Sequence, residues 1–230
     1  MASAGRRLLA ESVVLPPYSA LHRSKRYAAL ETRLQYDRYL RILTELHGTL
    51  EASPLRGLYT LSGGLLLGYR REGRALPWDC WDIDFELPHE HLPVLAASLP
   101  ALAAAGWRHR VTWAHNGGEV AEVRFIRKLV GLDFFVTYPR GGDDASWVFA
   151  RQHGRWVQAE QRIPRGGTKA VEFLGLRWLV PDPVEVPLTA MYGAWSVPDP
   201  TWDYMQSPAI VSTMPWTNPP VDWPGHRNGP

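Results

Sequence analysis

The chain has a single cysteine, Cys80, among its 230 residues. One thiol excludes an internal disulfide framework and a metal site built from several thiolates. A long apolar run is also missing, so the sequence predicts no membrane-spanning helix. The formal net charge is only +2, which provides no strong field to attract nucleic acid or an acidic membrane. Residues 1–20 make a poor signal peptide, and together these features predict a cytoplasmic location.

The composition is that of a folded protein rather than a disordered one. Apolar residues make up 45% of the chain, and a domain of this length can bury a full core. We expect a flexible arm over residues 1–20, one catalytic domain over 21–205 and a Pro/Trp-rich tail over 206–230. The tail has little periodicity and is expected to be loop.

The apolar spacing predicts both helices and strands. Apolar residues recur at helical spacing in the segment 26–46, while later segments alternate or form short apolar runs bounded by Gly and Pro. An α+β (mixed α/β) fold with a mixed sheet flanked by helices is therefore expected. We expect helices over 26–46, 65–71, 92–105 and 182–192, and strands over 58–61, 83–87, 107–113, 120–126, 129–138, 147–150, 155–163 and 171–180.

Two local signals support particular boundaries. Asn116-Gly117-Gly118 between two strand patterns predicts a hairpin. Asp182-Pro183 predicts a helix start, with Asp182 as N-cap and the proline in the first helical position. The following Gly193 predicts the end of that helix.

The acidic strand around Asp82-Ile83-Asp84 carries the clearest chemical signal. Alternate residues of a strand point the same way, so both carboxylates leave one face while Ile83 enters the core. Two hard oxygen ligands on one face suit Mg²⁺ or Mn²⁺ that also holds substrate phosphates. An Asp-x-Asp pair alone is weak evidence, because most such pairs are simply solvated.

Asp133 is the candidate third ligand of a metal site. It lies inside the apolar segment Val130–Val136, where a charge is costly unless it is paired or bound to a metal. Pairing with an arginine is an equally good interpretation of this residue alone. Asp79 and Glu86 lie near the acidic pair and rank below these three carboxylates.

Candidate substrate-binding residues surround this segment. Gly63 and Gly64 form a turn that opens a helix, where backbone N–H groups can hold a phosphate. Ser62 is expected either to touch that phosphate or to cap the turn. Arg71 is a candidate phosphate clamp, with an ion pair to Glu72 or Glu86 as the equal alternative. The weaker phosphate candidates, for which a solvated charge is the better interpretation, are Lys128 and Arg177.

The segment resembles the signature of the LicD/fukutin family. That signature has a Gly-Thr-Leu-Leu-Gly core, an arginine, Pro-Trp-Asp and then Asp-Ile-Asp. The positions that match it are Gly64, Leu66, Leu67, Gly68, Arg71, Pro77, Trp78, Asp79, Asp82, Ile83 and Asp84. Leu65 replaces the threonine, Cys80-Trp81 replace acidic residues, and the stretch before Asp82 is one residue longer.

Further matches extend the resemblance over about residues 30–204. Leu132-Asp133-Phe134 resembles the family's third acidic strand. The closing motif of the family is matched by Phe173, Leu174, Leu176, Val180-Pro181, Tyr192-Gly193, Trp195 and Pro198.

The resemblance implies a nucleotidyltransferase fold in which Asp82, Asp84 and Asp133 bind Mg²⁺ or Mn²⁺. The implied activity is that of a transferase that moves phosphocholine or ribitol phosphate from a CDP-linked donor to a glycan hydroxyl. Two alternatives stay open: a nucleotidyltransferase that modifies protein, RNA or a small molecule, and an inactive relative that acts as a binding module. Nucleic acid is not favoured as a partner, and a secretory-pathway location remains open because eukaryotic relatives work there.

Overall fold

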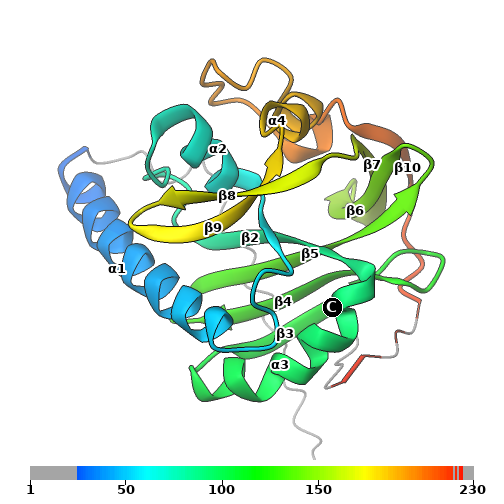
Figure 1. Cartoon of the computed structure of the whole chain (residues 1–230). Helices are drawn as coiled ribbons and strands as arrows, with labels where there is room; N and C mark the ends of the chain where they lie inside the picture. Colours follow the sequence, from blue (N-terminus) through cyan, green and yellow to red (C-terminus); the bar gives the residue numbers. More distant parts are fainter. Residues whose placement is uncertain (1–24, 220, 222, 225–230) are drawn as a thin grey trace, which may run out of the picture.

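The computed structural model describes residues 25–219, 221, 223 and 224. It is a mixed α+β structure in which helices flank a mixed sheet (Figure 1). The expected arm over residues 1–20 lies outside the described residues. The helices are α1 (Lys25–Glu51), α2 (Gly63–Glu72), α3 (Leu92–Ala104) and α4 (Glu185–Tyr192), with short 3-10 turns η2 (His89–His91) and η3 (Tyr204–Gln206).

The main sheet has eight strands and is organised around β5. Its strands are β1 (Thr60–Leu61), β2 (Asp82–Pro88), β3 (Arg108–Ala114), β4 (Val120–Arg127), β5 (Val130–Arg140), β6 (Asp143–Gln152), β7 (Arg155–Pro164) and β10 (Ile210–Pro215). The β2–β5 pair is parallel, whereas β5 pairs antiparallel with β4 and β6. A separate hairpin is formed by β8 (Gly167–Phe173) and β9 (Leu176–Asp182).

The hydrophobic core lies on one face of this sheet. Ile83 and Phe85 of β2 and Phe134 of β5 are fully buried there. Buried residues of α1 and α3, among them Leu43 and Leu95, belong to the same core. Because strand residues alternate between faces, Asp82 and Asp84 must leave β2 on the opposite side.

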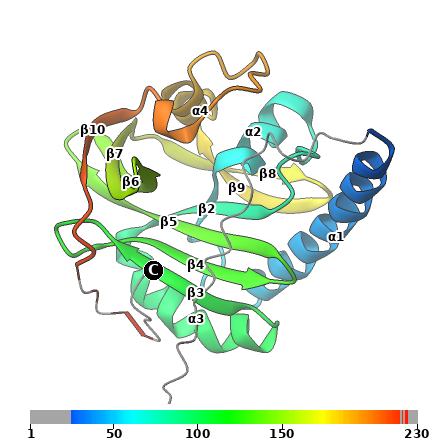
Figure 2. The ribbon, with the colours of Figure 1, turned by 180° about the vertical axis from the view of Figure 1, so that it is seen from behind.

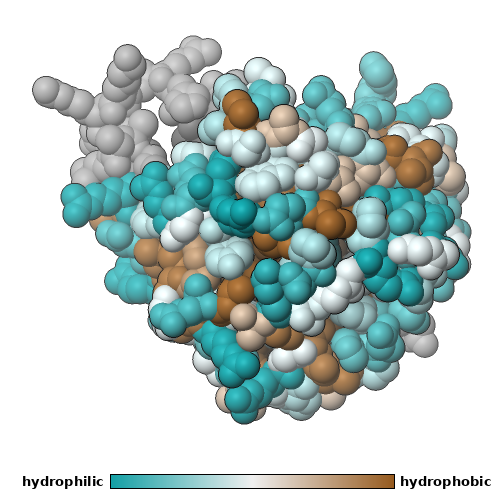
Figure 3. Space-filling model, turned by 45° about the horizontal axis from the view of Figure 1, so that its top comes forward, coloured by the Kyte–Doolittle hydropathy of each residue, from teal (hydrophilic) through white to brown (hydrophobic). Residues whose placement is uncertain are grey.

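Helices α2 and α4 and the β8–β9 hairpin lie beyond β2, on the side away from β3, in both views (Figures 1 and 2). Helix α1 runs beside strands β2 to β5, and α3 lies beside β3. Hydrophilic residues cover most of the face seen in Figure 3, and hydrophobic ones appear in small separate groups. No helix in the described part of the chain is long and apolar enough to cross a membrane.

Three segments differ from the sequence-based expectation. The segment 171–180 is two antiparallel strands rather than one, with a turn at Leu174-Gly175 where both residues have positive φ. Asp182 does not cap a helix, because it ends β9 and its carboxylate pairs with Lys169 at 2.9 Å. Helix α4 begins later, at Glu185.

The third difference lies in the expected loop tail. Residues Ile210–Pro215 form strand β10, which pairs antiparallel with β7. Its side chains are mostly exposed, since it lies at the edge of the sheet. An edge strand of this kind has little apolar periodicity, which explains why its sequence indicates loop.

Candidate metal centre

Three carboxylates converge on the face of the sheet opposite the core. Asp84 on β2 and Asp133 on β5 are direct partners in the parallel pairing, and Asp82 lies two residues before Asp84. One oxygen of each carboxylate lies within 4.8 Å of the others. The three residues proposed from sequence as metal ligands are therefore brought together, and we call them the acidic triad.

The acidic triad is poorly solvated. Asp133 is only 3% exposed, while Asp82 and Asp84 keep partial exposure. Burial raises the pKa of Asp84 well above its usual range, and the charges of Asp82 and Asp133 raise it further. Burial likewise raises the pKa of Asp82 and of Asp133. Raised pKa values show that negative charge is costly here, so a cation would be stabilised.

Arg124 on β4 supplies positive charge to this cluster. It stands opposite Asp133 in the β4–β5 pairing, and its Nε lies 3.3 Å from Asp133 Oδ1. The arginine partner considered for Asp133 from sequence is therefore present. That oxygen nevertheless accepts no hydrogen bond from the described residues, although it is buried. A buried carboxylate oxygen without a donor fits a metal ligand position.

Glu122 adds another carboxylate two residues before Arg124 on β4. It is 7% exposed, and burial raises its pKa to about 7. Gly131 makes room for the arginine, since a Cβ at Gly131 would lie 3.0 Å from Arg124 Nη2. Sequence reasoning missed both Glu122 and Arg124. The sequence did contain a signal for them, because both are charged residues inside the apolar segment 120–126, and the same kind of signal singled out Asp133.

The two glycines that open α2 lie against the acidic cluster. A Cβ on Gly63 would meet Asp84 Oδ2 at 2.1 Å, and one on Gly64 would meet Asp79 Oδ2 at 1.3 Å. Only glycine fits at either position, and Gly63 also has a φ of 53°. The start of a helix carries partial positive charge, which stabilises nearby carboxylates. Asp79 and Asp84 thus lie close to the start of α2.

Ser62 and Glu86 are joined to each other. Ser62 occupies the N-cap position of α2, but its side chain makes no capping bond. Its hydroxyl instead donates to Glu86 Oε1 at 3.2 Å, which corrects the capping interpretation. Burial raises the pKa of Glu86 to about 7, so its carboxyl group keeps a proton to a higher pH than an exposed glutamate does.

The three candidate phosphate-binding cations make contacts elsewhere or are exposed. Arg71 is 11% exposed in its side chain; its Nη1 donates to Trp195 O at 3.3 Å and its Nη2 lies 3.5 Å from Glu72 Oε1. Lys128 is exposed in the turn between β4 and β5. Arg177 is exposed on β9. None of the three forms an ion pair with the triad within the described residues.

One buried tyrosine, one partly buried tyrosine and the cysteine complete the surroundings. Burial raises the pKa of Tyr39 and of Tyr192, and in both cases the charges of Asp79, Asp82 and Asp84 raise it further. Both hydroxyls therefore stay protonated at neutral pH. Cys80 is fully buried, and burial raises its pKa to about 12, so its thiol is inert. An acidic residue at this position, as in the LicD/fukutin signature, would be buried in the core.

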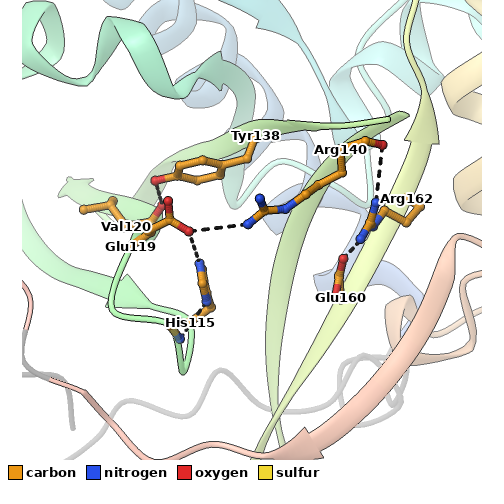
Figure 4. A network of polar contacts seen from close by, with 8 residues as sticks. His115, Glu119, Val120, Tyr138, Arg140, Glu160 and Arg162 are labelled. Atoms are coloured by element: carbon orange, nitrogen blue, oxygen red, sulfur yellow. Dashed lines mark hydrogen bonds and ion pairs between the residues drawn. The ribbon is translucent and has the colours of Figure 1, made fainter. Parts of the chain in front are cut away.

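A second polar network is structural. His115 stacks on Trp147 with ring centroids 3.9 Å apart, and its Nε2 lies 2.9 Å from Glu119 Oε2 (Figure 4). Arg140 reaches the same carboxylate at 3.6 Å, and Tyr138 donates to the backbone of Val120. These contacts connect the β3–β4 turn to β5 and satisfy the ring of His115 on both nitrogens. The network therefore fixes the turn between β3 and β4.

The arrangement provides oxygen ligands, a compensating guanidinium and a helix start in one place. A comparison with models of known protein families finds no match, and a comparison with curated proteins finds none either.

Proposed function

We propose that the protein is a metal-dependent transferase of the nucleotidyltransferase fold, related to the LicD/fukutin family. It would move a phosphorylated small group, of the phosphocholine or ribitol phosphate type, from a CDP-linked donor to a glycan hydroxyl. The observation that carries the proposal is the acidic triad. Its three carboxylates come from two directly paired strands and lie close together, and one of their oxygens, Asp133 Oδ1, is buried and accepts no hydrogen bond from the described residues.

The residues fit a divalent cation by charge and by distance. Opposite ligands of an octahedral Mg²⁺ lie about 4.2 Å apart and adjacent ligands about 3 Å apart, because each lies about 2.1 Å from the ion. The triad oxygens fall within 4.8 Å of one another, so the three side chains would have to rotate inward to hold the ion. Asp82, Asp84 and Asp133 would hold the ion. When bound, Mg²⁺ or Mn²⁺ neutralises the diphosphate and polarises its phosphorus for attack.

The remaining groups position and neutralise the reactants. Arg124 faces the triad and is the guanidinium best placed to bind a donor phosphate, since a planar fork matches phosphate oxygens. The acceptor oxygen attacks the phosphorus, the bond to the departing cytidine monophosphate breaks, and a carboxylate takes the acceptor proton. Asp133, which lies directly opposite Asp84, would take this proton in addition to holding the ion.

Isothermal titration with Mn²⁺ and a panel of cytidine nucleotides, with ATP and UTP for comparison, tests the proposal. CDP-choline, CDP-ribitol and CMP should be compared in the wild type, in Asp82→Asn and in Asp84→Asn. The exposed Asp37→Asn on α1 is the matched control. We expect metal-dependent binding of a CDP-linked donor in the wild type and the control, and its loss in the two triad variants.

Two results would point elsewhere. Binding of ATP or UTP in preference to every cytidine compound would favour a nucleotidyltransferase that modifies protein, RNA or a small molecule. Folded wild-type protein that binds neither metal nor nucleotide would instead favour an inactive binding module.

A further inference from the structure

A cleft of about 420 Å³ lies beside the carboxyl ends of β2 and β5. Its walls come from the main sheet, the start of β8 and helix α4. This volume is in the range of small-molecule sites. The lining residues that matter here are Thr60, Glu86, Glu90, Thr137, Asp144 and Arg165.

The cleft shares a wall with the acidic triad. Glu86 lies two residues beyond Asp84 on β2, which places both side chains on the same face about 7 Å apart. Ser62 donates a hydrogen bond to Glu86, and the next residue, Gly63, packs directly against Asp84. The cleft and the triad are therefore neighbouring compartments on one face of the sheet.

The polar lining of the cleft favours ligands that donate hydrogen bonds. Three carboxylates line it, those of Glu86, Glu90 and Asp144, with Arg165 and His91 as the basic groups. Arg165 is already engaged, since its Nε lies 2.9 Å from Asp144 Oδ1 and its Nη2 donates to a backbone carbonyl. Because Asp144 already holds Arg165, an anionic phosphate would not find this guanidinium free, whereas hydroxyl groups would find carboxylate acceptors.

Apolar walls complete this chemistry. Several prolines line the cleft, among them Pro88 and Pro187. A pyrrolidine ring presents a flat apolar surface that can pack against the C–H face of a sugar or polyol. Polar acceptors and small apolar surfaces together suit a neutral polyhydroxyl compound.

We propose that this cleft binds the neutral, hydroxyl-bearing acceptor, a sugar or polyol unit, while the anionic donor binds at the acidic triad. The inference rests on the proposed transferase function and assigns its second substrate to a separate compartment. Glu86 lies at the border between the cleft and the triad, where it accepts a hydrogen bond from Ser62 and a second one from a ligand hydroxyl. Acceptor binding should therefore not depend on metal.

Ligand-observed NMR titration of the full chain provides the test. The probes are methyl β-galactoside, methyl β-N-acetylglucosaminide and ribitol, with gluconate as the anionic comparator. Thr137→Phe fills the cleft from β5, and Thr168→Trp blocks it from β8. Thr213→Phe, on the exposed edge strand β10, is the matched control. Thermal unfolding of every variant confirms that it is folded.

We expect at least one neutral probe to bind, with and without Mn²⁺ and also in Asp84→Asn. Its affinity should fall at least tenfold in both cleft variants and stay within twofold in Thr213→Phe, and gluconate should bind at least tenfold more weakly. The inference is overturned if no neutral probe binds, if gluconate binds as well, or if both folded cleft variants keep full affinity. Neutral-probe binding without any metal-dependent donor binding would refute only the transferase proposal.

Discussion

Asp84 and Asp133 stand directly opposite each other on the parallel strands β2 and β5. Two like charges in this position repel one another, and burial increases the cost. A sheet would be more stable with a neutral pair here. The arrangement thus sacrifices stability at a place where a cation would restore it, which is typical of functional sites.

Asp84→Asn should stabilise the metal-free protein. The amide keeps the shape of the side chain and removes repulsion with Asp82 and Asp133, so we expect a gain of about 1 kcal/mol at pH 8. The same variant should lose the rise in melting temperature that Mn²⁺ gives the wild type. Thermal unfolding with EDTA and with Mn²⁺ measures both effects. A destabilised metal-free variant that still responds to Mn²⁺ would contradict the assignment of this ligand.

Arg124→Gln should bind divalent metal more tightly than the wild type. The guanidinium competes with a metal for the carboxylate of Asp133, and removing one charge is expected to improve the Mn²⁺ affinity about tenfold. Affinity for the CDP-linked donor in the presence of Mn²⁺ should fall by a similar factor, because a phosphate partner is lost.

Arg162→Gln is the matched control for this variant. Arg162 pairs with Glu160 on β7 and is exposed to a similar degree, 29% against 34% for Arg124. Titration calorimetry should show unchanged metal and donor affinity in this control. Weaker metal binding in Arg124→Gln would argue that the arginine organises the triad rather than competes with the ion.

Gly64→Ala should disrupt the acidic site. The added methyl would lie 1.3 Å from Asp79 Oδ2, so the carboxylate or helix α2 has to move. We expect a loss of about 2–3 kcal/mol in the free energy of unfolding and weaker metal binding. Gly48 is exposed on α1, and a Cβ added there would meet no atom within 4 Å, so Gly48→Ala should instead raise the free energy of unfolding by about 0.5–1 kcal/mol. Urea denaturation distinguishes the two substitutions.

Metal-free protein should lose stability as the pH rises from about 4.5 to 7. The folded state holds a proton on Glu122, whose pKa is raised to about 7, while the unfolded state releases it at its ordinary pKa. The unfolded state therefore binds fewer protons in this window, and stability falls with pH. The raised pKa of Asp84 acts in the same direction.

Glu122→Gln should flatten this pH dependence by about 2–3 kcal/mol across the window. Urea denaturation in EDTA at pH 5, 6, 7 and 8 measures it, with the exposed Glu172→Gln on β8 as the control. Equal slopes in wild type and Glu122→Gln would show that Glu122 is ionised in the folded protein.

Local patterns predicted much of the secondary structure. Helical spacing located α1, although the helix extends to Glu51, and the Asn116-Gly117-Gly118 turn located the β3–β4 hairpin. Leu174 misled the prediction because a leucine with a φ of 57° is a rare turn residue. Nothing in its side chain indicates that the chain reverses there.

The acidic triad was predictable as a set of residues but not as a geometry. Alternation placed Asp82 and Asp84 on one face, and the cost of a buried charge singled out Asp133. The register that sets Asp84 opposite Asp133 depends on tertiary pairing, which no local pattern encodes. The same limit applies to Arg124, since its partner lies on a different strand.

The double pairing of β5 has a consequence for local motion. Residues 131–135 are paired with β2 on one edge and with β4 on the other, so exposing their amides requires opening two ladders at once. At Asp82, by contrast, β2 pairs with β5 on one edge, and the β1 pairing on the other edge involves only Phe85 and Glu86. Amide hydrogen exchange should therefore be slowest around Asp133 and faster at Asp82. Within the acidic triad, the backbone of Asp133 is therefore held more firmly than the backbone of Asp82.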